Sequence, residues 1–138
     1  EIYTLSLHDA LPICVSYKER NAMNRATLFD GLAERYGAAA EYPWAKSPDF
    51  AVFRHTGNRK WFCLYMPVPS EKLGMGEGGL TEIVNVKCRP EHIGAWRATA
   101  GILPAYHMNK EHWLSIVLAQ TPAENVWRLI DDSFVLTR

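Results

Sequence analysis

The chain has 138 residues, of which 48% are apolar and 22% charged, values typical of one globular domain rather than a disordered chain. No apolar run is long enough to cross a bilayer, so we expect no membrane-spanning segment. Fifteen basic and fifteen acidic residues cancel, so binding to nucleic acid through overall charge is disfavoured and any such role must rest on local clusters of cations.

Residues 1–22 are predicted to be a leader that does not belong to the natural protein. Residues 1–13 (EIYTLSLHDALPI) are similar to a translated sequencing adapter, and residues 14–22 to read-through of an untranslated region. A signal peptide is disfavoured because the start lacks basic residues. We therefore expect one domain over residues 23–138. A cytoplasmic location is expected because Cys63 and Cys88 lie in apolar runs without a secretion signal.

Residues 24–36 are predicted to form the first helix. Asn24 is a suitable N-cap, and Gly37 is a suitable C-terminal stop. Leu28 and Leu32 recur at helical spacing and indicate the buried face.

Residues 50–55 and 60–68 are predicted strands of a β-hairpin that turns at Gly57-Asn58, a pair that tolerates positive φ. Basic residues gather at the tip of this hairpin, and we call the cluster the basic hairpin: Arg54, His55, Arg59 and Lys60. These side chains are candidates for phosphate contacts. A solvated turn without a functional role is the competing interpretation.

A glycine-rich stretch, residues 70–80, is interpreted as a loop or wing. It lacks the Gly-Lys-Ser/Thr ending of a phosphate-binding loop, and Glu77 would repel an anion. A third strand is predicted over residues 81–88. A second helix begins at Arg89-Pro90 and is expected to stop at Gly101.

Residues 105–113 (AYHMNKEHW) form the most polar run of the chain, and we call them the signature segment. They lie between an apolar stretch and a predicted strand over residues 113–118. Such a run is typical of a surface site held by a rigid scaffold. Its candidate functional residues are His107, Asn109, Lys110 and His112. The alternative is an ordinary loop in which the asparagine only caps a turn.

The run Thr121-Pro122-Ala123-Glu124 matches a capping box that opens a last helix. The buried stripe of that helix is predicted to contain Val126, Leu129, Ile130 and Phe134. The resulting order is helix, three strands, helix, a strand-rich region around the signature segment, and helix, or roughly α-β-β-β-α-β-β-α. Short connections between consecutive strands favour an antiparallel sheet with helices packed on one side, an α+β fold.

Metal binding and catalysis are both disfavoured. His107 and His112 are five positions apart, which is a poor spacing for ligands on one helix face. Apolar neighbours keep the thiols of Cys63 and Cys88 protonated and unreactive. No nucleophile elbow, glycosidase carboxylate pair or dinucleotide fingerprint is visible. We expect no enzyme activity, no cofactor and no metal.

Four stretches resemble the MmcQ/YjbR family of small bacterial proteins. They are residues 59–62 (RKWF), 84–90 (VNVKCRP), 105–113 and 129–134 (LIDDSF). The resemblance extends from residue 23 to the C-terminus and implies a compact α+β fold, YjbR-like or CyaY-like, similar to that of secretion chaperones. Phe134 departs from the family pattern, where tyrosine is expected.

The resemblance also implies DNA binding through paired wing-like elements. We expect the basic hairpin and the signature segment to lie on a common side of the molecule and to contact phosphates there, with Asn109 able to read a base edge. The alternative is a protein- or peptide-interaction module, or a homodimer, built on the chaperone-like sheet. It requires that Trp44, Trp61 or Trp113 is exposed.

Overall fold

The computed structural model describes residues 23–138, so the predicted leader lies outside the described residues. The elements are α2 (Arg25–Tyr36), β1 (Ala51–Arg54), β2 (Trp61–Pro69), β3 (Leu80–Lys87), α3 (Pro90–Arg97), β4 (Ile102–Pro104), β5 (Trp113–Val117) and α4 (Ala123–Thr137). Two short 3₁₀ turns, η2 (Ser70–Leu73) and η3 (Leu118–Gln120), follow β2 and β5. This confirms the predicted order of helices and strands.

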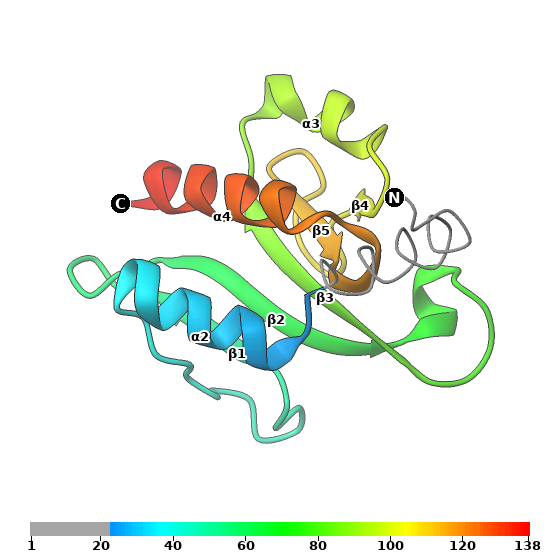
Figure 1. Ribbon diagram of the computed structural model, residues 1–138, viewed down its shortest axis with the longest axis horizontal. Coiled ribbons are helices and arrows are strands. Elements are labelled where there is room, and N and C mark those ends of the chain that lie inside the picture. The colour runs from blue at the N-terminus through cyan, green and yellow to red at the C-terminus, as the bar shows by residue number, and fades with distance from the viewer. Residues whose placement is uncertain (1–22) are drawn as a thin grey trace, which may run out of the picture.

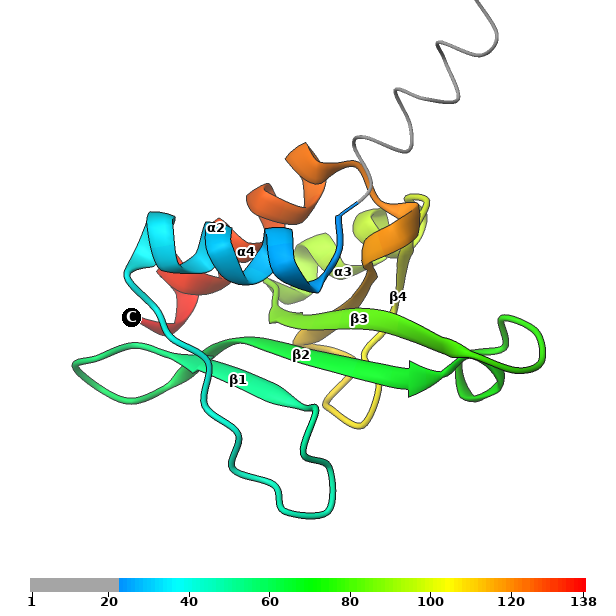
Figure 2. The ribbon, with the colours of Figure 1, turned by 60° about the horizontal axis from the view of Figure 1, so that its bottom comes forward.

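The five strands form one antiparallel sheet in the order β1-β2-β3-β5-β4. The hairpin between β1 and β2 is therefore at one edge of the sheet, and the short strand β4 is at the other. All three helices lie over the same face (Figures 1 and 2). The predicted α+β fold with helices on one side is thus confirmed.

The helices and the sheet enclose the larger of two apolar cores. Helix α4 contributes Val126, Leu129 and Ile130 to it, because its apolar residues recur at the spacing of one helix face. Fully buried residues of this core include Leu28, Leu32, Phe62, Val84, Leu114 and Ile130.

The second core lies on the opposite, helix-free face of the sheet, which we call the loop-covered face. Its buried residues are Val52, Leu64, Met66, Val68, Ile83 and Val117. They are covered by irregular chain from the connector before β1, from η2 and from the signature segment, through side chains that include Trp44, Phe50, Leu73, Leu103, Tyr106 and Met108. Figure 2 shows the connector and the β4–β5 connection below the sheet. Both faces of the sheet are therefore buried.

The caps of the first helix form as predicted. The side chain of Asn24 accepts a hydrogen bond from the backbone N–H of Thr27 at 3.0 Å, and Gly37 adopts the left-handed conformation with a φ of 63°.

The predicted capping box of the last helix does not form. The residue at the N-cap of helix α4 is Pro122 rather than Thr121, and it makes no side-chain cap. The Thr121 hydroxyl instead faces the preceding turn, where it donates to the carbonyl of Val117 at 2.8 Å.

The turn of the basic hairpin also differs from the prediction. The residue with positive φ is Arg59, at 64°, rather than Gly57 or Asn58. The backbone N–H of His55 bonds the carbonyl of Lys60, and that of Arg59 bonds the carbonyl of His55. The loop is thus longer than a two-residue turn, and its last residue takes the left-handed conformation.

Gly101 does not end the second helix, which stops at Arg97. It has a φ of 88° and lies where β4 passes η3. A Cβ atom there would meet the Thr121 Oγ1 at 2.1 Å and the backbone carbonyl oxygen of Gln120 at 2.9 Å. A glycine is therefore required both by backbone conformation and by space.

We predict that Gly101→Ala lowers the free energy of unfolding by about 2–3 kcal/mol, because strain and overpacking act together. Gly94→Ala is the matched control, since a Cβ in the middle of α3 meets no atom within 4 Å. It should raise stability by about 0.5–1 kcal/mol through helix propensity. Urea denaturation measures both, and equal effects of the two substitutions would contradict the packing described.

Candidate nucleic-acid interface

The two arginines of the basic hairpin share one carboxylate. Arg59 Nη2 lies 3.0 and 2.9 Å from the two carboxylate oxygens of Glu41, and Arg54 Nε lies 3.2 Å from one of them. The trio of Glu41, Arg54 and Arg59 therefore has one net positive charge, from two guanidinium groups and one carboxylate. Lys60 is exposed at the tip and has no ion pair within residues 23–138. The hairpin is thus less positive than its four basic residues alone suggest.

His55 is an anchor of the hairpin rather than part of its surface. It is only 8% exposed, and its Nε2 lies 2.8 Å from the Thr137 hydroxyl. That hydroxyl donates its proton to the carbonyl of Ser133, so it accepts from the imidazole N–H. Asn58 Nδ2 also donates to the carbonyl of Thr137 at 2.9 Å. The prediction that His55 contacts phosphate is therefore wrong, because its side chain is buried against α4.

The electrostatics of His55 agree with a neutral ring. Burial lowers its pKa, and the charges of Arg138 and Lys60 lower it further, while a hydrogen bond with the backbone of Phe134 acts in the opposite direction. The Phe134 ring packs beside the imidazole with ring centroids 4.3 Å apart.

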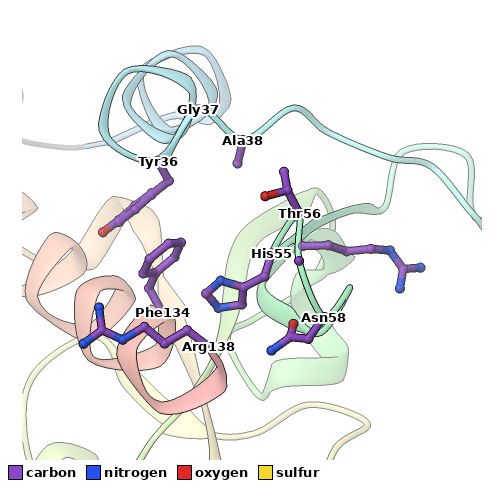
Figure 3. A pocket seen from close by; sticks show the side chains of 10 residues that line it. Tyr36, Gly37, Ala38, His55, Thr56, Asn58, Phe134 and Arg138 are labelled. Atoms are coloured by element: carbon purple, nitrogen blue, oxygen red, sulfur yellow. The ribbon is translucent and has the colours of Figure 1, made fainter.

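The phenylalanine at position 134 is explained by its packing. Besides His55, its ring stacks on Tyr36 with a centroid separation of 4.6 Å and meets Phe62 edge-on at 4.9 Å. The rings of Tyr36, His55 and Phe134, together with the hairpin and the ends of α2 and α4, border a hollow of about 270 Å³ (Figure 3).

The signature segment is held on the sheet by two buried polar residues. Asn85 and Ser115 lie opposite each other on β3 and β5, and both are fully buried. The Asn85 amide donates to the carbonyl of Tyr106 at 2.9 Å, and the backbone N–H of Tyr106 donates to Ser115 Oγ at 2.8 Å. Ser115 Oγ donates in turn to Asn85 Oδ1 at 2.5 Å. Both backbone groups of Tyr106 are thereby satisfied on the loop-covered face.

Neither Asn85 nor Ser115 was predicted from the sequence to hold the signature segment in place. Asn85 was nevertheless detectable as the one polar side chain between two buried valines of a strand, since a polar residue at such a position requires a specific partner.

Beyond Tyr106 the signature segment turns sharply. His107 is exposed and has a φ of 57°, which is uncommon for a residue other than glycine. Asn109 Oδ1 accepts from the backbone N–H of Glu111 at 2.7 Å, and its carbonyl accepts from Trp113. The asparagine oxygen therefore stabilises the turn, as the competing interpretation proposed, and the contact of Asn109 with a base edge stays a prediction. His112 is exposed, and its carbonyl accepts from the backbone of Cys88.

A groove of about 440 Å³ opens between the signature segment and η2, and we call it the lysine groove. Its lining residues are Lys72, Leu73, Leu103, Pro104, Ala105, Tyr106, His107 and Lys110. The lining includes two lysines and one histidine but no carboxylate. Lys72 was not predicted, because no local pattern brings it close to a segment more than thirty residues away.

The two predicted clusters do not form one continuous patch. His55 faces the helix layer, whereas the Arg54 guanidinium lies 5.5 Å from the ring of Trp61, which packs on the loop-covered face. The expectation of a common side is therefore wrong for His55. Arg54 also borders the hollow lined by Tyr36 and Phe134, so a common side for the remaining hairpin cations and the signature segment stays a prediction.

Other chemistry is sparse in the described part of the chain. Within residues 23–138, no three His, Cys, Asp or Glu side chains gather as metal ligands. Burial raises the pKa of both the Cys63 and the Cys88 thiol, so neither is activated as a nucleophile. None of the helices between residues 23 and 138 has the length and apolar character to cross a membrane.

The fold and the signature segment define a small α+β protein, and comparison with known proteins identifies its family. The family model named YjbR matches residues 33–136, so the chain belongs to the YjbR family. The uncharacterised Bacillus subtilis (strain 168) protein YyaQ is 46% identical over 117 residues, covering 84% of this chain and 99% of that protein.

Solved structures agree with this assignment. A crystal structure of a Pseudomonas syringae protein has a TM-score of 0.82 at 44% identity and covers 84% of this chain and all of its own. A Deinococcus radiodurans protein with a DUF419 domain has a TM-score of 0.62 at 21% identity, with 86% and 80% of the two chains covered. The latter similarity concerns the fold alone.

We predict that acidification destabilises the protein partly through His55. Its pKa is lower in the folded chain than in the unfolded one, so below about pH 6.5 the unfolded state binds more protons and stability falls. His55→Gln should lose less stability than the wild type between about pH 7.5 and about pH 5.5 in urea denaturation. His92→Gln, at an exposed position, is the control and should keep the wild-type dependence. An unchanged pH dependence in His55→Gln would refute the assignment.

Proposed function

We propose that the protein is a non-catalytic DNA-binding protein that contacts phosphates through the lysine groove. One observation carries this proposal: Lys72, Lys110 and His107 line a single groove with no carboxylate among its lining residues. Cations gathered in a concave surface attract phosphate even when the whole chain has no net charge.

The basic hairpin has a secondary role in this proposal. Lys60 is exposed, and the trio of Glu41, Arg54 and Arg59 adds one further positive charge. Because Arg59 keeps more than half of its side chain accessible, with 57% exposed, it can contact a phosphate while it remains paired.

The alternative of a protein- or peptide-interaction module has weaker support. Trp44, Trp61 and Trp113 are all partly buried, and none of them lines the lysine groove, so none adds the fully exposed aromatic anchor that this alternative requires. The large apolar side chains that are exposed, Tyr42, Leu80 and Val135, lie on three different elements or connections rather than in one patch.

We predict that Lys72→Ala/Lys110→Ala weakens DNA binding and its dependence on salt. Removing two phosphate contacts should reduce the slope of log affinity against log salt concentration by about 1.8 for duplex DNA and by about 1.4 for a single strand. Fluorescence anisotropy with labelled DNA at several salt concentrations measures this slope. Arg97→Ala/Arg128→Ala removes the same charge from exposed positions on α3 and α4 and should leave the slope almost unchanged. Equal losses in both double variants, or no salt-dependent binding by the wild type, would overturn the proposal.

Glu41→Gln tests the hairpin separately. The glutamine amide keeps an acceptor for the arginines but removes the negative charge of the carboxylate. The slope of log affinity against log salt concentration should therefore become steeper by up to about 0.9, and binding at low salt should be stronger. Glu34→Gln, which neutralises an exposed glutamate of α2, is the control. Identical behaviour of the two variants would exclude the hairpin from the interface and leave the groove as its only part.

A further inference from the structure

The lysine groove combines charge with an apolar floor. Lys72 comes from η2 and Lys110 from the signature segment, while Leu73, Leu103 and Tyr106 provide apolar and aromatic surface between them. The phosphates of a double helix would use only the lysines, because its bases are stacked inside the duplex. The apolar floor therefore requires a ligand that presents a flat, unpaired base together with phosphates.

The Tyr106 ring is suited to such a base. Its backbone is fixed on both sides by Asn85 and Ser115, and the residue, which packs on the second core, is partly buried where it lines the groove. The His107 imidazole lies nearly perpendicular to the Tyr106 ring, with ring centroids 4.0 Å apart. No hydrogen bond of the Tyr106 hydroxyl is found within residues 23–138, so packing and not hydrogen bonding defines the position of the ring.

The surroundings of the groove do not favour a duplex. The three helices described between residues 23 and 138 lie on the opposite face of the sheet, so none of these helices is placed beside the groove to enter a major groove (Figures 1 and 2). The connection between β2 and β3 extends beyond the sheet (Figure 2), and besides Lys72 it contains Glu71 and Glu77, so it has no net positive charge. It is a poor phosphate-binding ribbon.

We infer that the lysine groove binds single-stranded DNA, with one unpaired base against Tyr106 and the flanking phosphates on Lys72 and Lys110. This inference rests on the proposed function and names the form of nucleic acid for the same site. The wild-type protein should bind a short labelled single strand several-fold more tightly than the same strand annealed to its complement.

The first test removes the aromatic ring of Tyr106 and leaves the charge of the groove unchanged. Tyr106→Leu should reduce affinity for the single strand about tenfold and leave duplex affinity unchanged, since stacking is lost and the phosphate contacts remain. Tyr106→Phe keeps the aromatic ring and should bind as the wild type does. Circular dichroism and thermal melting of each variant report on folding.

A second pair of variants keeps the test decisive if Tyr106→Leu fails to fold. Leu73→Ser removes apolar floor from the groove and should weaken single-strand binding. Leu80→Ser makes the same change at a leucine that is 65% exposed outside the groove and should have no effect.

Three outcomes are distinguishable. The inference is supported if the wild-type protein prefers the single strand and this preference disappears in Tyr106→Leu and in Leu73→Ser. Salt-dependent binding of equal strength to both forms, unaffected by these variants, overturns it and leaves the proposed function standing. Absence of salt-dependent binding to either form overturns both.

Discussion

The hydrogen-bonded triangle of Asn85, Ser115 and the Tyr106 backbone is the constraint on which the loop-covered face depends. Three polar groups are buried there between two sheet strands and an irregular segment, and each has a partner. A buried polar group left unpaired costs about 1–3 kcal/mol, so the segment can neither slide nor lift without a penalty at several atoms at once. The backbone position from which the Tyr106 ring packs on the second core follows from these hydrogen bonds.

The same triangle explains how a sheet with helices on one side buries its other side. Irregular chain cannot usually cover an apolar face, because its backbone groups need partners. Here the side chains of two strands supply those partners, and Tyr106 and Met108 then pack on the second core. The lysine groove is the gap that remains between this segment and η2, so its shape is a product of the packing that covers the sheet.

Charge is distributed in a way that the net balance conceals. Glu41 reaches the basic hairpin from the connector before β1 and neutralises one of its two arginines, whereas the lysine groove has no acidic lining residue. The family comparisons do not decide what this charge binds, because the Bacillus relative is uncharacterised and the Deinococcus similarity concerns the fold. The support for the proposed DNA binding therefore comes from the lysine groove itself.

Local sequence determined the order of the elements and much of the helix chemistry. Apolar periodicity placed the helices and strands close to their observed bounds, and Asn24 and Gly37 cap α2 because capping depends on neighbours within one turn. Two predictions from local sequence were wrong. The Thr121 hydroxyl bonds to the carbonyl of the preceding Val117 instead of capping α4, and Gly101 is required by its contact with Gln120 and Thr121 rather than as a helix stop.

Tertiary structure alone decided which predicted residues are accessible and which are joined. It buried His55 against Thr137, paired Arg59 with Glu41, and brought Lys72 to the same groove as Lys110. Each of these contacts joins segments that are far apart in the chain, and no periodicity within one segment encodes its distant partner. The sequence by itself therefore determined the architecture and the family of this protein, while the arrangement of its charges was settled only when the sheet brought distant segments together.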